Sequence, residues 1–333
     1  MIDQDRRDHY MVYHIAMMVM GDVDPSYPAL EYIADRFELN IEQRLWISFL
    51  YQSCYTASTV FYIYNEFPDY ENVDVRRLEW WWGNNKHKLF FQTDRAKVKN
   101  FNKFVPMFQS YRTLVGKSQK AWFDSMIQGT PQENYDRLYK ECGKIYYIGR
   151  FSLFLYLESL HRLTKLDIQP TGLDFKNAES CANGLCYALG WDDLVGLPFQ
   201  PQHIKNLTYE LDKLMKDLQL GELLPIDYWC VETSLCAYKK LYWNKRYLGY
   251  YIDRLQTELL LMEKNVPEGV DWSVLWDFRK EYFDHRWLGE LQGWTGVRKH
   301  MMGLPSKEYL LQVLQGQYKK RVEFERVWSV YDY

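Results

Sequence analysis

The segment 229–243 carries side chains that can move a proton, attack carbon and bind phosphate. Trp229, Glu232, Cys236, Lys239 and Trp243 recur every three or four residues, which places them on one stripe of a helix. A carboxylate flanked by tryptophans is expensive to bury unless it has a partner, and Lys239 could form a structural ion pair with it. The alternative makes Glu232 a general base, Lys239 a phosphate-binding cation and Cys236 a nucleophile of lowered pKa. A lone cysteine on a helix is more often a core residue.

A second polar set lies in KIYYIGRFSLFLYLESLHRL (144–163), which is otherwise rich in apolar and aromatic residues. Glu158 and Arg162 have the i,i+4 spacing of an ordinary ion pair on a helix surface. Alternatively, Glu158 lies at the edge of the core and faces a cleft, where burial would raise its pKa and suit it to proton transfer. Arg150 follows a glycine at the expected helix start, where its guanidinium and the free backbone amides together suit a phosphate.

Aromatic and basic residues are interleaved between residues 76 and 123, a combination suited to stacking on unpaired nucleobases. The candidates for stacking are Trp80, Trp82 and Tyr111, and the candidates for phosphate or DNA contacts there are Arg95, Lys97 and Arg112. A net charge of −3 and a pI near 6.2 argue against binding polyanions without selectivity, but they leave room for a local basic groove.

Several common catalytic motifs are absent from the sequence. Gly116-Lys117-Ser118 fails as a phosphate loop because Tyr111 stands where the earlier glycine is required. There is no GxGxxG, HExxH or GxSxG motif, and the six cysteines form no CxxC pair. We therefore expect buried, reduced thiols and neither a metal nor a cofactor.

The elements that would position these residues are predicted to be helices. We expect one long apolar segment or two helices over 41–67, helices over 117–128 and 131–142, and further helices over 149–166, 203–220 and 226–243. Helical spacing after residue 95 is interrupted at Pro106. Thr130 and Pro131 form a typical helix start, and a helix should begin near Ala178.

These patterns predict an all-α fold, because no alternation of strands and helices is present. We expect a single helical domain over residues 1–333, which could be divided into two lobes (about 1–145 and 146–333) with the active cleft between them. No apolar run reaches the roughly 18 residues that a bilayer span needs, and the charged N-terminus does not resemble a secretory signal. We expect a cytoplasmic protein without a membrane partner.

Particular strings of the chain carry a family resemblance. GRFSLFLYLESLHRL, AESCANGLCYALGW and DYWCVETSLCAYKK with RYLGYYIDR resemble the amino acid:DNA transferases, which belong with the alpha-glutamyl/putrescinyl thymine pyrophosphorylases of bacteriophages. FLYQSCYTASTVFYIYNEFPDY, RRLEWWWGNNKHKLFFQTDRAKVK and LWDFRKEYFDHRWLGE are also similar to that group, so the resemblance spans about residues 40–295.

The resemblance implies a helical fold distantly similar to helix-hairpin-helix DNA glycosylases, although the hairpin glycine motif of those enzymes is not recognisable here. It also implies a DNA substrate. A separate kinase phosphorylates 5-hydroxymethyluracil in DNA, and the transferase then replaces the (pyro)phosphate with an amine from an amino acid or polyamine, which gives a hypermodified thymine. The enzyme would work in the host cytoplasm if a phage encodes it.

The implied reaction gives the candidate residues specific roles. Arg150 and Lys239, with Lys240 in reserve, would stabilise the departing phosphate. Glu232, or else Glu158, would accept a proton from the amine. Cys236 could add transiently to C6 of the base. The target nucleotide should be flipped out of the duplex.

The base would stack on Trp80, Trp82 or Tyr111, and a polar turn would read its edge or hold a phosphate. The residues of that turn are Ser180, Asn183 and Gly184, for which helix capping is the alternative. Two other functions stay open, a base-excising glycosylase or lyase on the same scaffold and a non-catalytic helical protein that binds DNA or protein.

Overall fold

The computed structural model describes residues 2–92, 95–219, 225–284, 288, 296–297, 302–316 and 325–326. Within these ranges the fold is all-α, as predicted, and the two strands are a two-residue antiparallel pair, β1 (Gly296–Val297) and β2 (Glu325–Arg326). The chain divides into two compact units. Unit 1 comprises Met1–Pro25, Thr171–Arg254 and Lys280–Tyr333, and unit 2 comprises Ser26–Pro170 and Leu255–Arg279.

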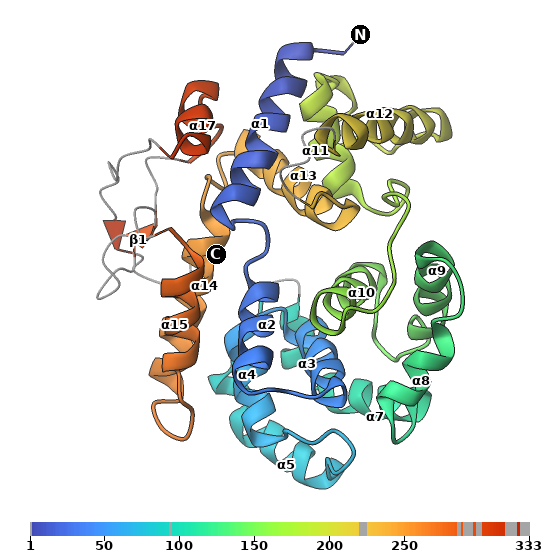
Figure 1. Ribbon diagram of the computed structural model, residues 1–333, viewed down its shortest axis with the longest axis vertical. Coiled ribbons are helices and arrows are strands. Elements are labelled where there is room, and N and C mark those ends of the chain that lie inside the picture. Colours follow the sequence, from blue (N-terminus) through green and yellow to red (C-terminus); the bar gives the residue numbers. More distant parts are fainter. Residues whose placement is uncertain are drawn as a thin grey trace. The chain divides into compact units, whose positions relative to one another are not determined.

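Unit 1 is built around the crossing of two helices, α11 (Glu179–Leu189) and α13 (Tyr228–Tyr242), which Figure 1 shows beside the N-terminal helix α1 (Gln4–Met20). Helix α1 packs on both of them and on α17 (Lys307–Leu314), while the amphipathic α12 (Pro201–Gln219) packs on α11. Gly184 makes the crossing possible, since a Cβ atom there would lie 2.0 Å from the Leu235 carbonyl oxygen.

Unit 2 has α3 (Ile41–Cys54) and α10 (Arg150–Thr164) at its centre, with α2 (Ser26–Arg36), α4 (Ala57–Glu66) and α9 (Pro131–Cys142) packed against them. Its other helices are α5 (Val75–Asn85), η1 (Lys86–Lys88), α6 (Ala96–Asn100), α7 (Phe104–Val115) and α8 (Gln119–Met126). The core is aromatic: Phe49 stacks on Tyr111 with ring centres 4.1 Å apart, and Trp46 stacks on Phe49 at 5.6 Å.

The chain passes between the units four times, and two helices are divided by these passages. Helix α14 (Tyr250–Asn265) gives its first residues to unit 1 and the rest to unit 2, and α15 (Ser273–Tyr282) is divided after Arg279. The short helix η3 (Asp192–Leu194) belongs to unit 1.

Buried carboxylates in both units bind the free amides at helix starts. Asp22 accepts hydrogen bonds from the N–H groups of Gly249, Tyr251 and Ile252 at 2.7, 2.9 and 3.2 Å, which caps α14. Glu258 does the same for α4 through the Ala57 amide at 2.9 Å. These carboxylates are buried because the amides would otherwise lack acceptors.

The predicted helices agree closely with the observed ones. The segment 41–67 forms two helices, α3 and α4, which are separated at Tyr55 and Thr56. Helix α9 begins at Pro131 behind a Thr130–Glu133 capping box, and α11 begins just after Ala178. The prediction of an interruption at Pro106 is wrong, because the break falls at 101–103 and Pro106 lies in the first turn of α7, where a missing N–H costs little.

No helix in the described ranges is both long and apolar enough to cross a bilayer. The similarity to helix-hairpin-helix glycosylases stays a prediction.

Candidate active site

The predicted stripe on α13 lies against the N-terminal end of α11, within unit 1. Lys239 donates a hydrogen bond from Nζ to Ser180 Oγ at 2.7 Å. One turn earlier, Cys236 Sγ donates to Glu232 Oε1 at 3.4 Å. Glu232 and Lys239 are buried, and Cys236 is half-buried. The α11–α13 crossing therefore joins a thiol, a carboxylate and an ammonium group at one place.

Cys236 differs electrostatically from the other cysteines whose pKa is shifted. A hydrogen bond from Cys181 on α11, together with Ser180, Glu232 and Lys239, lowers the pKa of the Cys236 thiol to about 6 although burial opposes the charge. By contrast, burial raises the pKa of both Cys54 and Cys186 to about 12. The lowered pKa of Cys236 favours its thiolate form, which is the state that attacks carbon.

Lys239 is a buried cation that contacts a hydroxyl group and an aromatic ring. It is 8% exposed, and besides Ser180 it contacts the ring of Trp243, whose centre lies 4.6 Å from Nζ. Burial lowers the pKa of the Lys239 ammonium, the Cys236 thiolate opposes this, and the nearby Arg246 adds to it. Lys239 forms no salt bridge with a described carboxylate, so the predicted ion pair with Glu232 is wrong. The i,i+7 spacing allowed such a pair, but the ammonium is directed to Ser180 on α11.

The set predicted as a polar turn is helical. Ser180, Asn183 and Gly184 all lie inside α11, whose cap, Ala178, makes no side-chain bond, so neither the turn nor the capping interpretation describes them. Asn183 Oδ1 accepts from the Gly196 amide at 3.0 Å and so holds the following loop, and Gly184 is required for close packing. Of the three, Ser180 is the residue that contacts the site.

Sequence reasoning missed Cys181 and Arg246 as members of this site. Cys181 Sγ donates to the Ala178 carbonyl at 3.2 Å, and across the helix crossing it lowers the pKa of the Cys236 thiol. Arg246, in the loop after α13, is close enough to influence the charge of both Cys236 and Lys239. A signal for Arg246 was present in RYLGYYIDR, where an arginine precedes adjacent tyrosines.

Glu158 and Arg150, the second candidate for the base and a predicted phosphate ligand, lie in unit 2. Glu158 is buried and forms the i,i+4 salt bridge with Arg162, 3.4 Å from Nη2 to Oε1, which confirms that pair. Arg150 is the first residue of α10, as predicted, and is half-buried.

The predicted stacking residues have very different surroundings. Trp80 is 69% exposed, so its ring is accessible. Trp82 is 2% exposed and stacks on Phe104 at 4.4 Å, and Tyr111 is fully buried with its hydroxyl donating to Gln119 Oε1 at 2.7 Å. The core covers the rings of Trp82 and Tyr111, so a stacking role for these two is wrong for the observed conformation.

The residues predicted to contact phosphate between positions 95 and 112 also differ in their surroundings. Arg95 is buried and donates to Ser152 and Gln52, and Arg112 donates to the carbonyls of Val73 and Glu71 at 2.6 and 3.1 Å. These two guanidinium groups therefore hold the fold together. Lys97 is exposed, and Lys240 on α13 is half-buried.

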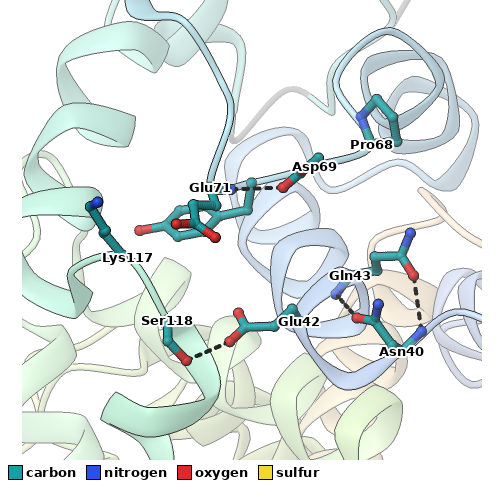
Figure 2. Close-up of a pocket in the computed structure, with 9 residues that line it drawn as sticks. Asn40, Glu42, Gln43, Pro68, Asp69, Glu71, Lys117 and Ser118 are labelled. Carbon is teal, nitrogen blue, oxygen red and sulfur yellow. Dashed lines mark hydrogen bonds between the residues drawn. The ribbon is translucent and has the colours of Figure 1, made fainter.

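A separate pocket of about 450 Å³ lies in unit 2 and is lined by Asn40, Glu42, Gln43, Pro68, Asp69, Tyr70, Glu71, Lys117 and Ser118. Figure 2 shows the Ser118 hydroxyl directed at the Glu42 carboxylate, to which it donates at 2.7 Å. Glu42 also accepts from the amides of Gln119 and Lys120, both at 3.0 Å. A carboxylate thus already occupies the anion position at the start of α8, which agrees with the rejection of a phosphate loop at Lys117-Ser118.

No group of three or more His, Cys, Asp or Glu side chains in the described part of the chain is arranged to hold a metal ion.

Comparison with known proteins identifies the group to which these helices belong. Residues 19–247 match the family described as amino acid:DNA transferase, which is well over half of the chain. The chain belongs to this family. The match includes both α11 and α13 and ends one residue after Arg246, so the site at the crossing lies within the family region. The late string LWDFRKEYFDHRWLGE lies outside it.

Among curated proteins, this chain is similar to a serinyltransferase of Salmonella phage ViI. The two are 28% identical over 262 residues, which cover 72% of this chain and 63% of the phage protein. The match therefore spans slightly less than two thirds of the relative's length.

Proposed function

We propose that this protein transfers an amino acid to an activated 5-substituted deoxyuridine in DNA. The substrate would be 5-(pyro)phosphoryloxymethyl-deoxyuridine, made by a separate kinase that phosphorylates 5-hydroxymethyluracil in DNA. The observation that carries the proposal is membership of the amino acid:DNA transferase family over a region that contains the Cys236–Glu232–Lys239 cluster. The serinyltransferase relative makes L-serine the first donor to test.

The reaction exchanges one bond at the 5-methylene carbon. The amine nitrogen bonds to that carbon, and the bond from the carbon to the phosphate oxygen breaks, with its electron pair leaving on the (pyro)phosphate. The amine must be neutral to attack and must lose a further proton afterwards. Glu232, buried beside Cys236, accepts that proton.

Lys239 stabilises the negative charge that develops on the leaving group. Its ammonium is held by Ser180 in a mostly dry position and has no carboxylate partner in a salt bridge within the described ranges, so its charge is available to an incoming anion. Lys240, on the same helix and half-buried, is the second candidate for this role.

Cys236 provides a covalent route to the same product. Its thiolate adds to C6 of the base, and the electron pair moves through the ring to expel the (pyro)phosphate and leave an exocyclic methylene group. The amine adds to this methylene, and loss of the thiolate from C6 restores the ring. The lowered pKa of Cys236 supports this route.

The DNA contacts are assigned to groups that are exposed or half-buried. The target nucleotide is flipped out of the duplex, because a base within the stack cannot reach side chains on a helix crossing. In unit 2, Trp80 offers an uncovered ring for stacking, and Lys97 and Arg150 offer positive charge for phosphates. Glu158 remains a second candidate for the base. The reaction would take place in the host cytoplasm if a phage encodes the protein.

The deciding experiment supplies the complete set of substrates. The protein is incubated with DNA carrying phosphorylated 5-hydroxymethyluracil and a mixture of amino acids and polyamines, and the digested nucleosides are analysed by mass spectrometry. We expect an amino-acid adduct of thymidine with L-serine among the donors. Nucleosides free of any amine adduct, across all donors, would refute the proposal.

Two variants with matched controls test the assigned roles. Glu232→Gln and Lys239→Gln should each slow the transfer by about 100-fold or more, with DNA binding retained. The exposed Glu268→Gln and Lys205→Gln remove the same charges elsewhere and should transfer at the normal rate. Release of a free base would instead indicate a glycosylase, and full activity of Glu232→Gln would exclude it as the base.

A further inference from the structure

Arg246 occupies an unusual environment in the loop between α13 and α14. Its guanidinium carbon lies 4.7 Å from the ring centre of Tyr250 and 4.6 Å from that of Tyr251. It also donates a hydrogen bond from Nη1 to the Tyr251 hydroxyl. Two ring faces and one hydroxyl therefore fix the orientation of this guanidinium, which is half-buried.

The residues that hold Arg246 are themselves held from the protein interior. Tyr251 is 8% exposed, and its amide donates to the buried Asp22 at 2.9 Å. The Arg246 carbonyl accepts from the Gly303 amide at 2.9 Å. The guanidinium is thus part of a rigid frame, and the entropy of ordering it is lost on folding and not when a ligand binds.

Arg246 is near enough to Lys239 to lower the pKa of that ammonium, and both cations also influence the charge of Cys236. Neither forms a salt bridge with a carboxylate in the described ranges, and the acidic groups that influence Lys239 are Cys236 and, more weakly, Cys181 and the exposed Glu179. Partly buried like charges repel each other and lose hydration, so their juxtaposition favours binding of an anion between them.

The shape of each cation indicates which anion it accepts. Lys239 is a point charge, which suits a phosphate. The guanidinium group of Arg246 is planar, and the rings of Tyr250 and Tyr251 lie over its faces. The N–H donors that remain free are therefore accessible at the edge of the guanidinium plane. Nε and Nη2 donate to no protein acceptor in the part of the chain that the structure describes. Two parallel N–H donors at the edge of a plane match the two oxygens of a carboxylate.

We propose that Arg246, oriented by Tyr250 and Tyr251, binds the α-carboxylate of the amino-acid donor. This inference rests on the proposed function and deepens it, because it makes an α-amino acid the donor class and disfavours polyamines, which have no carboxylate. Arg246 is a specificity residue in this arrangement: it holds the donor near Cys236 and Glu232, and Lys239 stays available for the leaving group.

The test compares L-serine with ethanolamine, which is the same amine without the carboxylate. In the transfer assay, Arg246→Gln should raise the KM for L-serine by tenfold or more and leave kcat nearly unchanged, whereas the weak transfer of ethanolamine should not change. Arg246→Lys keeps the charge but not the fork and should be intermediate. Tyr251→Phe keeps the ring and removes the hydroxyl, so it should raise the KM by a smaller factor. Lys205→Gln is the matched control and should behave as the unaltered protein does.

Direct binding separates failure of this inference from failure of the proposed function. Isothermal titration of the full-length protein with L-serine, ethanolamine and inorganic pyrophosphate needs no transfer reaction. We expect Arg246→Gln to weaken L-serine binding by tenfold or more and to leave pyrophosphate binding unchanged. An unchanged affinity for L-serine, weakened pyrophosphate binding alone, or equal use of ethanolamine by the unaltered protein would each overturn the inference. Absence of any transfer with intact L-serine binding would instead count against the proposed function.

Discussion

The lowered pKa of Cys236 makes a quantitative prediction about its reactivity. With a pKa of about 6, roughly 90% of the thiol is ionised at pH 7, whereas at its ordinary value of 9.0 only about 1% would be. The thiolate is the reactive form, so alkylation of Cys236 near neutral pH should already be close to its maximum rate. The pH midpoint of the alkylation rate should lie near 6.

The structure also predicts which substitutions move that midpoint, and in which order. Cys181 makes the largest contribution to stabilising the thiolate, so Cys181→Ala should raise the midpoint most. Lys239→Gln removes a nearby positive charge and should raise it by less. The exposed Lys205→Gln removes the same charge at a distant surface position and should leave the midpoint unchanged.

The assay follows iodoacetamide labelling from about pH 4.5 to about pH 10.5, a range that brackets both pKa values. Peptide mapping by mass spectrometry assigns the label, and Cys236→Ser should abolish it. The remaining five cysteines are buried and serve as internal controls. A midpoint close to 9, or a midpoint that neither Cys181→Ala nor Lys239→Gln moves, would refute the electrostatic account of this site.

Further predictions concern the scaffold. Gly184→Ala should lower the free energy of unfolding by about 1–3 kcal/mol and reduce transfer, because the added Cβ would lie 2.0 Å from the Leu235 carbonyl oxygen. The control Gly172→Ala places a Cβ with no atom within 4 Å, so its free energy of unfolding should change by less than about 0.5 kcal/mol. Urea unfolding measures both variants. Asp22→Ala leaves three amides at the start of α14 without their acceptor and should cost about 3 kcal/mol in the same assay. Burial lowers the pKa of His14 to about 4, so below about pH 6.5 the imidazole is protonated in the unfolded chain and stays neutral in the folded protein. The free energy of unfolding should therefore fall between about pH 6.5 and about pH 4 by more than it does in His14→Gln. Equal pH slopes of the two proteins would contradict this.

Local sequence signals were sufficient for most helices. The Thr130–Glu133 capping box and Pro131 define the start of α9, and the apolar spacing of 203–220 defines α12 to within two residues. These signals succeed because capping and amphipathic periodicity act between residues less than two turns apart. Pro106 shows the limit of such local signals, because a proline interrupts a helix only when it lies beyond the first turn.

The candidate site was only partly readable from the sequence. The spacing of Glu232, Cys236 and Lys239 placed them on one helix face, and their contacts at the α11–α13 crossing agree with that. The same spacing could not show whether Lys239 would pair with Glu232 or with Ser180, because the competing partner is 59 residues away.

Burial was likewise decided by the tertiary structure. Trp80 and Trp82 are two residues apart on one helix, yet one is exposed and the other is covered by Phe104. Arg95 reads as a DNA contact and is instead buried against Ser152.

By itself the sequence determined the helical class, most helix limits and the family, because these depend on local spacing and on short characteristic strings. The tertiary structure alone decided which described cations form no salt bridge and which thiol has a lowered pKa. A group's hydration and its neighbours across a helix crossing set its electrostatic energy, and residues far apart in the chain, such as Cys181 and Cys236, supply those neighbours.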